Sequence, residues 1–493
     1  MAISVADRLV NRGTAARVPA RVLASGLAGA QGLRQEARVG RVSEAGGGRA
    51  SGRGRAAILL VVLVAAVAIA WIGHRPADVP LPAVGQVAEP ARPSPPPSPP
   101  WTQAQLSDLL SAIVRADANG LRAGDYRAGE LRGALAARQT GKPVDAIADA
   151  AALALAHDYA AGRIRNRHRF NWYIDYAGPD AATMRRLIVA AREDQRLDTW
   201  LTGLLPDDAD YRALRDALSA TPEEDWQRRD RIKANMERHR WLPRDFGTAP
   251  DRLTINLPTY RLEVTRDGQT ANSYRAVIGA TDMPTPVLSA PVRQVIVNPD
   301  WIVPASIVRR SHLKPSAKYI FSRRPDGTLR VRQKPGAGNA LGKVKIEFPN
   351  RLAIYFHDTP SRSLFGAEVR TFSHGCVRVQ DIATLGRSIV ANQARYDAAM
   401  ASVQTRGFAP ARAWRADIVY LTLVRSADGS LKDVGDPYRL DQAMAATLEG
   451  RKPRVPPPAV VIPPSPAAPT AIDPGVEVID AVSANVGAPT TPE

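Results

Sequence analysis

Two short stretches decide how this chain is interpreted: Ile354-Tyr355-Phe356-His357-Asp358-Thr359-Pro360 and Ser373-His374-Gly375-Cys376-Val377-Arg378-Val379. The second holds the single cysteine of the 493 residues, with one histidine two positions before it and another nineteen positions before it. A thiol needs a neighbouring base, or a lowered pKa, to act as a nucleophile near neutral pH. An apolar run that ends in a histidine, followed by a loop and a Gly-Cys turn, can bring an imidazole beside the sulfur. A single cysteine is more often an inert buried thiol, so from these residues alone a catalytic pair of Cys376 with His357 is the less common of two alternatives.

Neighbouring residues suggest further roles at such a site. Ser373 and Gly375 suit a sharp turn whose backbone N–H groups could face a developing oxyanion. His374 is a second candidate base or an oxyanion-side donor, and Arg378 is either a ligand for a substrate carboxylate or half of a structural ion pair. Tyr355 alternates onto the face of His357, which makes it a candidate for lining the site. Asp358 could orient an imidazole, but it is adjacent to His357 in the strand and is therefore expected to point to the opposite face.

The intervals around the motif resemble a known family. A histidine, fifteen intervening residues and then Ser-His-Gly-Cys followed by Val-Arg resemble the signature of the L,D-transpeptidases with a YkuD-type catalytic domain. Further segments resemble the long, YcbB-like branch, so that the resemblance covers roughly residues 100 to 440. These segments are Asn256–Val264, Pro284-Thr285-Pro286, Asn298-Pro299-Asp300-Trp301, Gly338-Asn339-Ala340-Leu341-Gly342 and His357-Asp358-Thr359-Pro360.

The resemblance implies a substrate and a reaction. The donor would be a tetrapeptide stem of peptidoglycan, whose third-residue carbonyl forms a thioester with Cys376 while the terminal D-alanine leaves. An amine of a second stem would accept the acyl group and give a 3→3 cross-link. The resemblance also places Trp301 and Asn339 at the substrate, and cell-wall synthesis proteins among the candidate partners. We expect no metal and no other cofactor, because the single cysteine and scattered histidines form no ligand set of the usual spacing.

Other functions stay open at this stage. A cysteine carboxypeptidase or endopeptidase would share the thioester step and use water as the acceptor. A membrane-tethered wall-binding protein without activity is a second alternative, against which the intact Cys–His pair argues. A third, a basic membrane protein that recruits partners through its proline-rich ends, rests on composition alone.

The sequence predicts an α+β fold in which a YkuD-like catalytic domain, built on a mostly antiparallel β-sheet, follows a helical scaffold domain. Residues 101–247 form the helical domain, with amphipathic stretches at 102–117, 143–161, 181–194, 208–219 and 223–240. Thr221-Pro222-Glu223-Glu224 is typical of a helix start. Many relatives carry a peptidoglycan-binding module near this point, and this chain has only about a dozen residues there, so wall binding through such a module is in doubt.

The catalytic domain is expected over residues 248–450. Its predicted features are a hairpin turn at Arg266-Asp267-Gly268-Gln269, strands at 277–279, 294–297, 343–346, 352–356 and 417–424, and a helix within 380–397. Residues 303–342 break the strand rhythm with Pro, Lys and Arg. We interpret them as an inserted subdomain that caps the site.

The two ends of the chain differ from its centre. Residues 1–55 contain ten Arg and three acids and predict a disordered cytoplasmic tail, and residues 56–73 predict a transmembrane anchor with the catalytic domain in the periplasm. Residues 74–100 form a proline-rich linker, and residues 451–493 a disordered tail. This arrangement makes the inner membrane a partner. The net charge of +18 invites a nucleic-acid partner, which we discount because the charge is spread and no nucleic-acid motif accompanies it.

Overall fold

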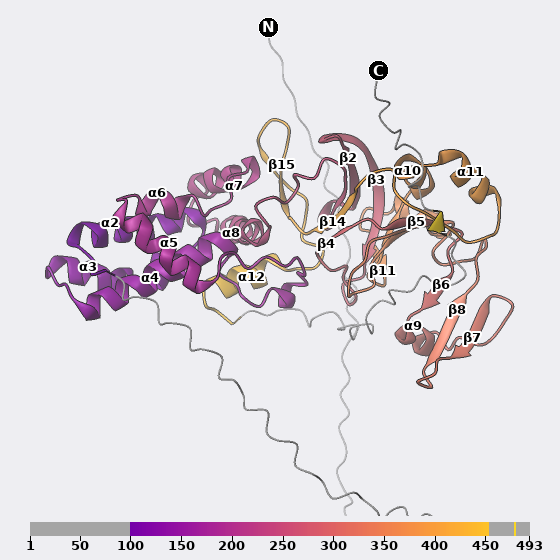
Figure 1. The fold of residues 1–493 in the computed structure, drawn as a ribbon, viewed down its shortest axis with the longest axis horizontal. Helices are drawn as coiled ribbons and strands as arrows, with labels where there is room; N and C mark the ends of the chain where they lie inside the picture. Colours follow the sequence, from indigo (N-terminus) through magenta and orange to yellow (C-terminus); the bar gives the residue numbers. More distant parts are fainter. Residues whose placement is uncertain (1–98, 453–477, 480–493) are drawn as a thin grey trace, which may run out of the picture. The chain divides into compact units, whose positions relative to one another are not determined.

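The computed structural model describes residues 99–452 and 478–479 (Figure 1). The predicted basic tail (1–55), the anchor (56–73) and most of the linker and C-terminal tail lie outside the described residues. Within the described part, no helix is both long enough and apolar enough to cross a membrane.

The first half of the described chain is helical, as its amphipathic stretches predict. The first helix, α2 (Gln103–Val114), begins with a reciprocal cap in which Thr102 Oγ1 accepts from Gln105 N and Gln105 Oε1 accepts from Thr102 N, both at 3.2 Å. Short 3₁₀ turns lie at Arg115–Asn119, Ala123–Tyr126 and Arg167–Phe170. The other helices are α3 (Ala128–Ala136), α4 (Lys142–Ala161), α5 (Ala181–Glu193), α6 (Leu197–Thr202), α7 (Ala209–Ala220) and α8 (Trp226–Trp241).

The start of α8 differs from the prediction. The segment Thr221-Pro222-Glu223-Glu224 suggested a helix start, but the helix begins at Trp226. The N–H of Asp225 donates to the Pro222 carbonyl at 3.2 Å, which closes a turn first. The Asp225 carboxylate then caps the helix by accepting from Arg228 N at 3.2 Å. The aspartate, not the threonine, therefore supplies the cap.

Helix α8 joins the helical region to the β-rich region through buried polar contacts. The Arg238 guanidinium, 1% exposed, donates to the Asp441 carboxylate at 2.5 Å from α12 (Asp441–Leu448). The Asn235 side chain accepts from Thr422 N at 2.9 Å. Helices α8 and α12 pack side by side. Because a buried charge is costly without its partner, these contacts fix α8 against the catalytic region.

The β-rich region is a mostly antiparallel sheet, as predicted. Its strands are hydrogen-bonded in the order β17-β13-β5-β9-β10-β12-β3-β2-β1-β14-β4, with β11 beside β3. The long strand β3 (Gln269–Gly279) belongs to both halves, because its first part pairs with β2 and its end pairs with β12 and β11. The other strands are β1 (Arg252–Asn256), β2 (Arg261–Arg266), β4 (Leu288–Pro291), β5 (Gln294–Val297), β9 (Val344–Glu347), β10 (Phe356–His357), β11 (Thr371–Ser373), β12 (Val377–Val379), β13 (Arg406–Phe408), β14 (Arg415–Val419) and β17 (Val478–Ile479).

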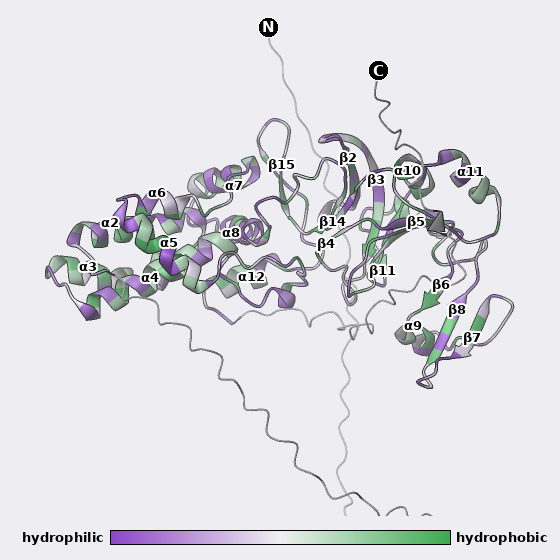
Figure 2. Cartoon of the chain, viewed as in Figure 1, coloured by the Kyte–Doolittle hydropathy of each residue, from purple (hydrophilic) through white to green (hydrophobic). Residues whose placement is uncertain are grey.

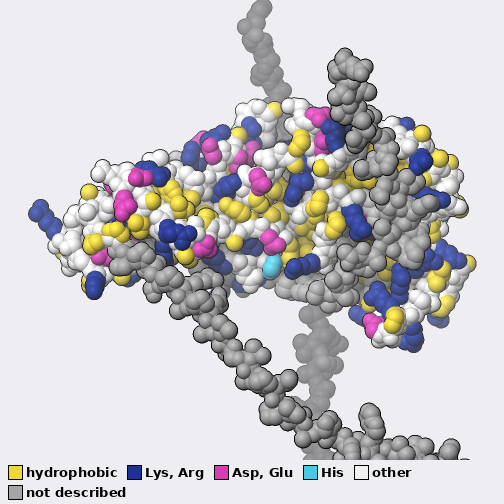
Figure 3. Space-filling model, in the orientation of Figure 1, with side chains coloured by type: hydrophobic (Ala, Val, Ile, Leu, Met, Phe, Trp, Pro, Cys, Tyr) yellow, Lys and Arg dark blue, Asp and Glu magenta, His cyan; other side chains and the backbone are white. Residues whose placement is uncertain are grey.

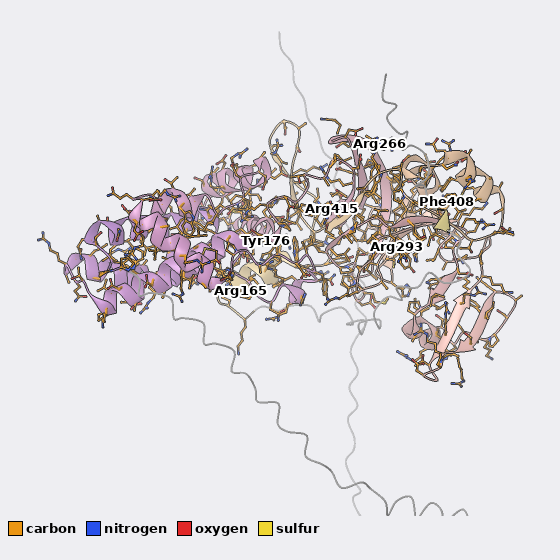
Figure 4. All side chains as sticks on the ribbon, in the orientation of Figure 1. Arg165, Tyr176, Arg266, Arg293, Phe408 and Arg415 are labelled. Carbon is orange, nitrogen blue, oxygen red and sulfur yellow. The ribbon has the colours of Figure 1, made fainter. Side chains whose placement is uncertain are left out.

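The alternation of apolar and polar residues along these strands builds one core. Leu262 on β2, Val295 on β5 and Phe356 on β10 are fully buried in the same cluster. In Figure 2 the strands carry both colours, and β3 changes from purple over its exposed first part to green toward its buried end. An arginine packs against one edge of this core. The guanidinium of Arg266, which is labelled in Figure 4, lies 5.6 Å from the ring centre of buried Trp414.

The predicted hairpin is confirmed, and its geometry explains the sequence. Asp267 and Gly268 both have positive φ angles, 49° and 77°. Two positive φ angles in a two-residue loop are the mark of a turn that matches the twist of its strands, and Asp-Gly adopts them readily.

Three predicted elements differ from the structure: one strand begins later than expected, and a second strand and a helix are each divided in two. The strand predicted at 352–356 shrinks to β10, because Asn350 Oδ1 accepts from Leu352 N and Ile354 N and holds the preceding residues in a turn. The strand predicted at 417–424 divides into β14 and β15 (Leu423–Arg425), which pairs with β16 (Leu431–Asp433). The helix predicted within 380–397 is two helices, α10 (Ile382–Ile389) and α11 (Gln393–Ala401).

The predicted insertion contains a small sheet of its own. Strands β6 (Trp301–Val303), β8 (Leu329–Gln333) and β7 (Tyr319–Arg323) pair antiparallel in that order, and α9 (Ala305–Arg310) packs on β8. Strand β6 therefore begins two residues before the predicted boundary at 303.

Candidate active site

The pairing of β10 with β12 brings the two signature stretches together. The strands run parallel in the register Phe356↔Val377 and His357↔Arg378, and Val377 N donates to the Tyr355 carbonyl at 3.2 Å. Phe356 and Val377 are fully buried in the core. Because side chains alternate along a strand, the residues on either side of this pair share the opposite face. These residues are Tyr355 and His357 on one strand and Cys376 and Arg378 on the other.

The imidazole of His357 is held by a backbone carbonyl. Its Nδ1 lies 2.6 Å from the Asp358 carbonyl oxygen, and the side chain is buried. A carbonyl oxygen can only accept, so Nδ1 carries the proton and Nε2 is left as the acceptor. Burial, reinforced by the positive charge of Arg378, lowers the pKa of His357 to about 3. The neutral imidazole at neutral pH can therefore take a proton at Nε2.

The carboxylate of Asp358 is committed elsewhere. Asp358 Oδ2 accepts from Lys343 N at 2.9 Å, and Asp358 Oδ1 accepts from Arg362 Nη2 at 2.9 Å. This agrees with the expectation that its side chain points away from the imidazole. The orienting group that the sequence did not reveal is the carbonyl of the same residue.

The Cys376 thiol is partly exposed and lies 3.7 Å from the Ala353 carbonyl oxygen. Burial raises the pKa of the Cys376 thiol, and this effect outweighs the Tyr355 hydrogen bonds and the charges of Lys345 and Arg378, which lower it. Within the described chain, no hydrogen bond joins the thiol to His357. The resting thiol is therefore protonated near neutral pH and depends on a base for activation.

Tyr355 links the thiol to the insertion. Its ring lies 5.6 Å from the His357 ring in an edge-on arrangement. The Cys376 thiol and the Trp301 side chain both act on its hydroxyl, the sulfur raising the pKa of Tyr355 and Trp301 lowering it, whereas the role of Trp301 in binding substrate stays a prediction. Burial, followed by the nearby sulfur, raises the pKa of Tyr355 well above its usual range, so the hydroxyl stays a donor.

Lys345 is a site residue that sequence reasoning missed. It pairs with His357 across β9 and β10, its Nζ lies 4.5 Å from the Tyr355 ring centre, and it is 3.3 Å from Glu347 Oε1. Gln294 Nε2 donates to the other carboxylate oxygen of Glu347 at 2.6 Å. The side-chain oxygen of Gln294 is buried and has no hydrogen-bond partner. The strand containing Lys345 was predicted, but nothing in the sequence says which strand lies beside it.

The turn before the thiol is built around Ser373. Its buried hydroxyl accepts from Gly375 N at 3.2 Å and donates to the Cys376 carbonyl. Gly375 has a φ of +111°, which a residue with a Cβ rarely adopts. Because the Gly375 N–H donates to Ser373, it is not free to face an oxyanion, and the Cys376 N–H is the candidate donor that remains of the two. His374 is exposed at the same turn.

Arg378 has a buried polar atom with nothing to bind. Its Nε is buried and has no hydrogen-bond partner, and among the described residues its guanidinium pairs with no carboxylate. Burial lowers the pKa of Arg378. A structural ion pair would have needed an acid here, so the geometry favours the alternative in which the guanidinium receives an anionic ligand.

Asn339 does not face the reacting groups. Its side chain is 1% exposed and donates to the carbonyl oxygens of Pro299 and Lys334 at 3.0 and 2.9 Å, while its own oxygen accepts from Leu341 N at 2.7 Å. These bonds satisfy the amide and hold the base of the insertion. No metal-binding group of three or more His, Cys, Asp or Glu occurs in the part of the chain that the structure describes.

Comparison with known proteins agrees with this geometry. Residues 250–391 match the model of the YkuD family, the L,D-transpeptidase catalytic domain, and residues 97–218 match a scaffold domain. A Haemophilus influenzae Rd protein described as "Putative L,D-transpeptidase" is 30% identical over 242 residues, which cover 43% of this chain and 48% of that protein. The chain thus spans about half the length of this curated relative.

Solved structures of low sequence identity are also similar. The L,D-transpeptidase of Mycobacterium smegmatis is 14% identical, with coverage of 34% of this chain and 58% of that chain and a TM-score of 0.19. L,D-transpeptidase 3 of Mycobacterium tuberculosis, in complex with a faropenem-derived adduct, is 16% identical, with coverage of 34% and 60% and a TM-score of 0.20.

Proposed function

The chain carries an L,D-transpeptidase catalytic domain of the YkuD type together with a scaffold domain, and we propose that it forms 3→3 cross-links between peptidoglycan stems through a thioester on Cys376. The observation that carries the proposal is the β10–β12 register, which puts His357 and Cys376 on one face of adjacent strands. The imidazole held at Nδ1 by the Asp358 carbonyl leaves Nε2 as the base.

The acylation step follows from these groups. Cys376 Sγ attacks the carbonyl carbon of the third stem residue as its proton passes to His357 Nε2. The tetrahedral intermediate collapses when the bond to the terminal D-alanine breaks and the imidazolium returns that proton to the leaving amine. The Cys376 N–H is the proposed donor to the oxyanion, a contribution of about 3 kcal/mol in comparable sites.

The second half of the reaction restores the thiol. An amine of another stem attacks the thioester carbonyl, and His357 Nε2 removes its proton. The new amide bond forms as the sulfur leaves, and the imidazolium reprotonates the sulfur. Arg378 is placed to bind a stem carboxylate with its unpartnered guanidinium beside the thiol, which orients the donor.

The proposal extends to the location of the enzyme. Residues 56–73 would anchor the chain in the inner membrane, with Arg53 and Arg55 on the cytoplasmic side and the catalytic domain in the periplasm. Protease protection of spheroplasts tests this, because a periplasmic domain is digested without lysis. Protection of residues 101–450 until lysis would contradict it.

The reaction is tested by mass spectrometry of the full-length protein, purified in detergent, with disaccharide-tetrapeptides. We expect a cross-linked dimer with loss of D-alanine and a transient acyl adduct on Cys376, both absent in a Cys376→Ala control. Release of D-alanine with tripeptide alone would instead establish the hydrolase. If neither product nor adduct forms, including with a carbapenem as acyl donor, the proposal fails.

A further inference from the structure

The positive charge of the chain is not evenly spread, as we first interpreted it, but is concentrated in the insertion and in residues 1–55. Residues 301–334 contain nine Lys and Arg and a single acid, Asp326, a net charge of +8 within 34 residues. With +7 in residues 1–55, this leaves +3 of the total +18 for the rest of the chain.

Most of these cations face solvent. Within the described residues, six of them are exposed and pair with no carboxylate, and the space-filling view shows Lys and Arg gathered over the insertion, at the lower right (Figure 3). Arg332, by contrast, pairs with Asp300 at 3.2 Å. We define the basic insertion surface by the six exposed cations, Arg309, Lys314, Lys318, Arg323, Arg324 and Lys334.

The basic insertion surface is attached beside the thiol. Strand β6 of the same small sheet begins at Trp301, and Trp301 and Cys376 both act on the pKa of the Tyr355 hydroxyl, so this end of the insertion lies near the thiol. The Asn339 amide fastens the other end by donating to the Lys334 carbonyl at 2.9 Å. A polymer with one segment at Cys376 therefore has neighbouring segments within reach of these cations.

We propose that the basic insertion surface binds the carboxylate-bearing peptidoglycan polymer outside the reacting stem, an inference that rests on the proposed function. Each stem peptide ends in a carboxylate, so an intact glycan strand is a polyanion, whereas a single soluble stem is not. Unpaired cations on one face raise the local concentration of such a polymer and hold it by many weak, salt-sensitive contacts. Arg378 would bind the carboxylate of the reacting stem, and the basic insertion surface would bind the carboxylates of neighbouring stems.

The test measures co-sedimentation of the full chain, as the Cys376→Ala protein, with purified insoluble peptidoglycan at increasing NaCl. The variant is Arg323→Glu/Arg324→Glu. Its matched control, Arg132→Glu/Arg185→Glu, makes the same charge change at exposed arginines of α3 and α5. We expect binding about tenfold weaker for the insertion variant at low salt, binding within about twofold of the parent for the control, and loss of the difference at high salt.

Equal losses in the two variants would overturn the proposal, because net charge alone would then explain binding. Loss of binding to phosphatidylglycerol vesicles with unchanged binding to peptidoglycan would also overturn it and assign the surface to the membrane. Should the first variant unfold, Lys314→Glu/Lys318→Glu provides the same comparison. Turnover of soluble disaccharide-tetrapeptide by the unmodified chain reports separately on the proposed function, because co-sedimentation needs no catalysis.

Discussion

The Nδ1 atom of His357 lies 2.6 Å from the carbonyl oxygen of Asp358, the next residue in the chain. A residue that orients its neighbour through its own backbone leaves the tautomer independent of any side chain. The arrangement also keeps the proton on Nδ1 and the lone pair on Nε2, the nitrogen that accepts the thiol proton in the proposed mechanism.

The first prediction concerns the protonation state of His357. Because its pKa is lowered to about 3, nitrogen-15 NMR of the ring should show the neutral Nδ1–H tautomer from pH 8 down to pH 5. In the unfolded chain His357 takes up this proton near pH 6.5, so its contribution to the free energy of unfolding is fully present above that pH. This contribution should fall by about 1.4 kcal/mol per pH unit as the pH drops from 6.5 toward 3. In His357→Gln the pH dependence of the free energy of unfolding should be shallower by this amount, and a titration midpoint of His357 near 6.5 in the folded protein would contradict the assignment.

A second prediction separates the Asp358 carboxylate from its carbonyl. Asp358→Asn keeps the backbone oxygen at His357 and an amide oxygen that can accept from Lys343 N, and it loses the ion pair with Arg362. We expect kcat/KM to stay within about threefold of the parent, with a loss of roughly 1 kcal/mol in the free energy of unfolding. His357→Gln, as the comparison, should lose about 10²- to 10⁴-fold in kcat/KM. Similar losses in the two variants would show that the carboxylate is the orienting group.

The sequence predicted those features of the site that depend on the alternation of side chains along one strand and on the histidine–cysteine motif. Tyr355 and His357 were placed on one face, and Asp358 on the other, from period-two reasoning alone. The pattern within one strand does not indicate which other strand pairs with it, and Lys345 was missed because it lies on such a neighbouring strand. The strand predicted at 352–356 was wrong for a local reason. The Asn350 side chain accepts the backbone hydrogen bonds that a strand would donate to its neighbour, and the pattern of hydrophobic residues does not indicate this.

A third prediction tests Arg378 as the carboxylate ligand. Arg378→Gln removes the charge and leaves a neutral hydrogen-bonding group, so kcat/KM for the tetrapeptide should fall about tenfold to 100-fold. The decisive comparison uses a stem whose candidate carboxylate is amidated. The parent should discriminate strongly against this analogue, whereas Arg378→Gln should treat both substrates alike. A variant that loses rate but keeps the discrimination would indicate a structural role.

A fourth prediction concerns Lys345, whose positive charge acts on the thiol from across the Tyr355 ring. Removing a nearby cation disfavours the thiolate, so Lys345→Met should raise the pKa of Cys376. The pH midpoint of iodoacetamide alkylation should move upward, and Lys345→Arg should restore it. Lys343→Met, at an exposed lysine whose Nζ donates to the Met400 carbonyl at 3.2 Å, is the matched control. An identical shift in both variants would mean that only net charge matters.

The final prediction isolates the backbone of the nucleophile turn. A Cβ on Gly375 would meet only Ile354 Cδ1 at 3.5 Å, an ordinary contact, so the φ of +111° is the whole difficulty for an alanine. Holding a residue with a Cβ there costs about 1–3 kcal/mol, and relief of that strain would turn the Cys376 N–H away from the oxyanion. Gly375→Ala should therefore lower both the thermal midpoint and the rate of Cys376 acylation. Gly366→Ala, with open space at its Cβ and no positive φ, should change neither. A Gly375→Ala protein that acylates at the parental rate would exclude the Cys376 N–H as an oxyanion donor fixed by this turn.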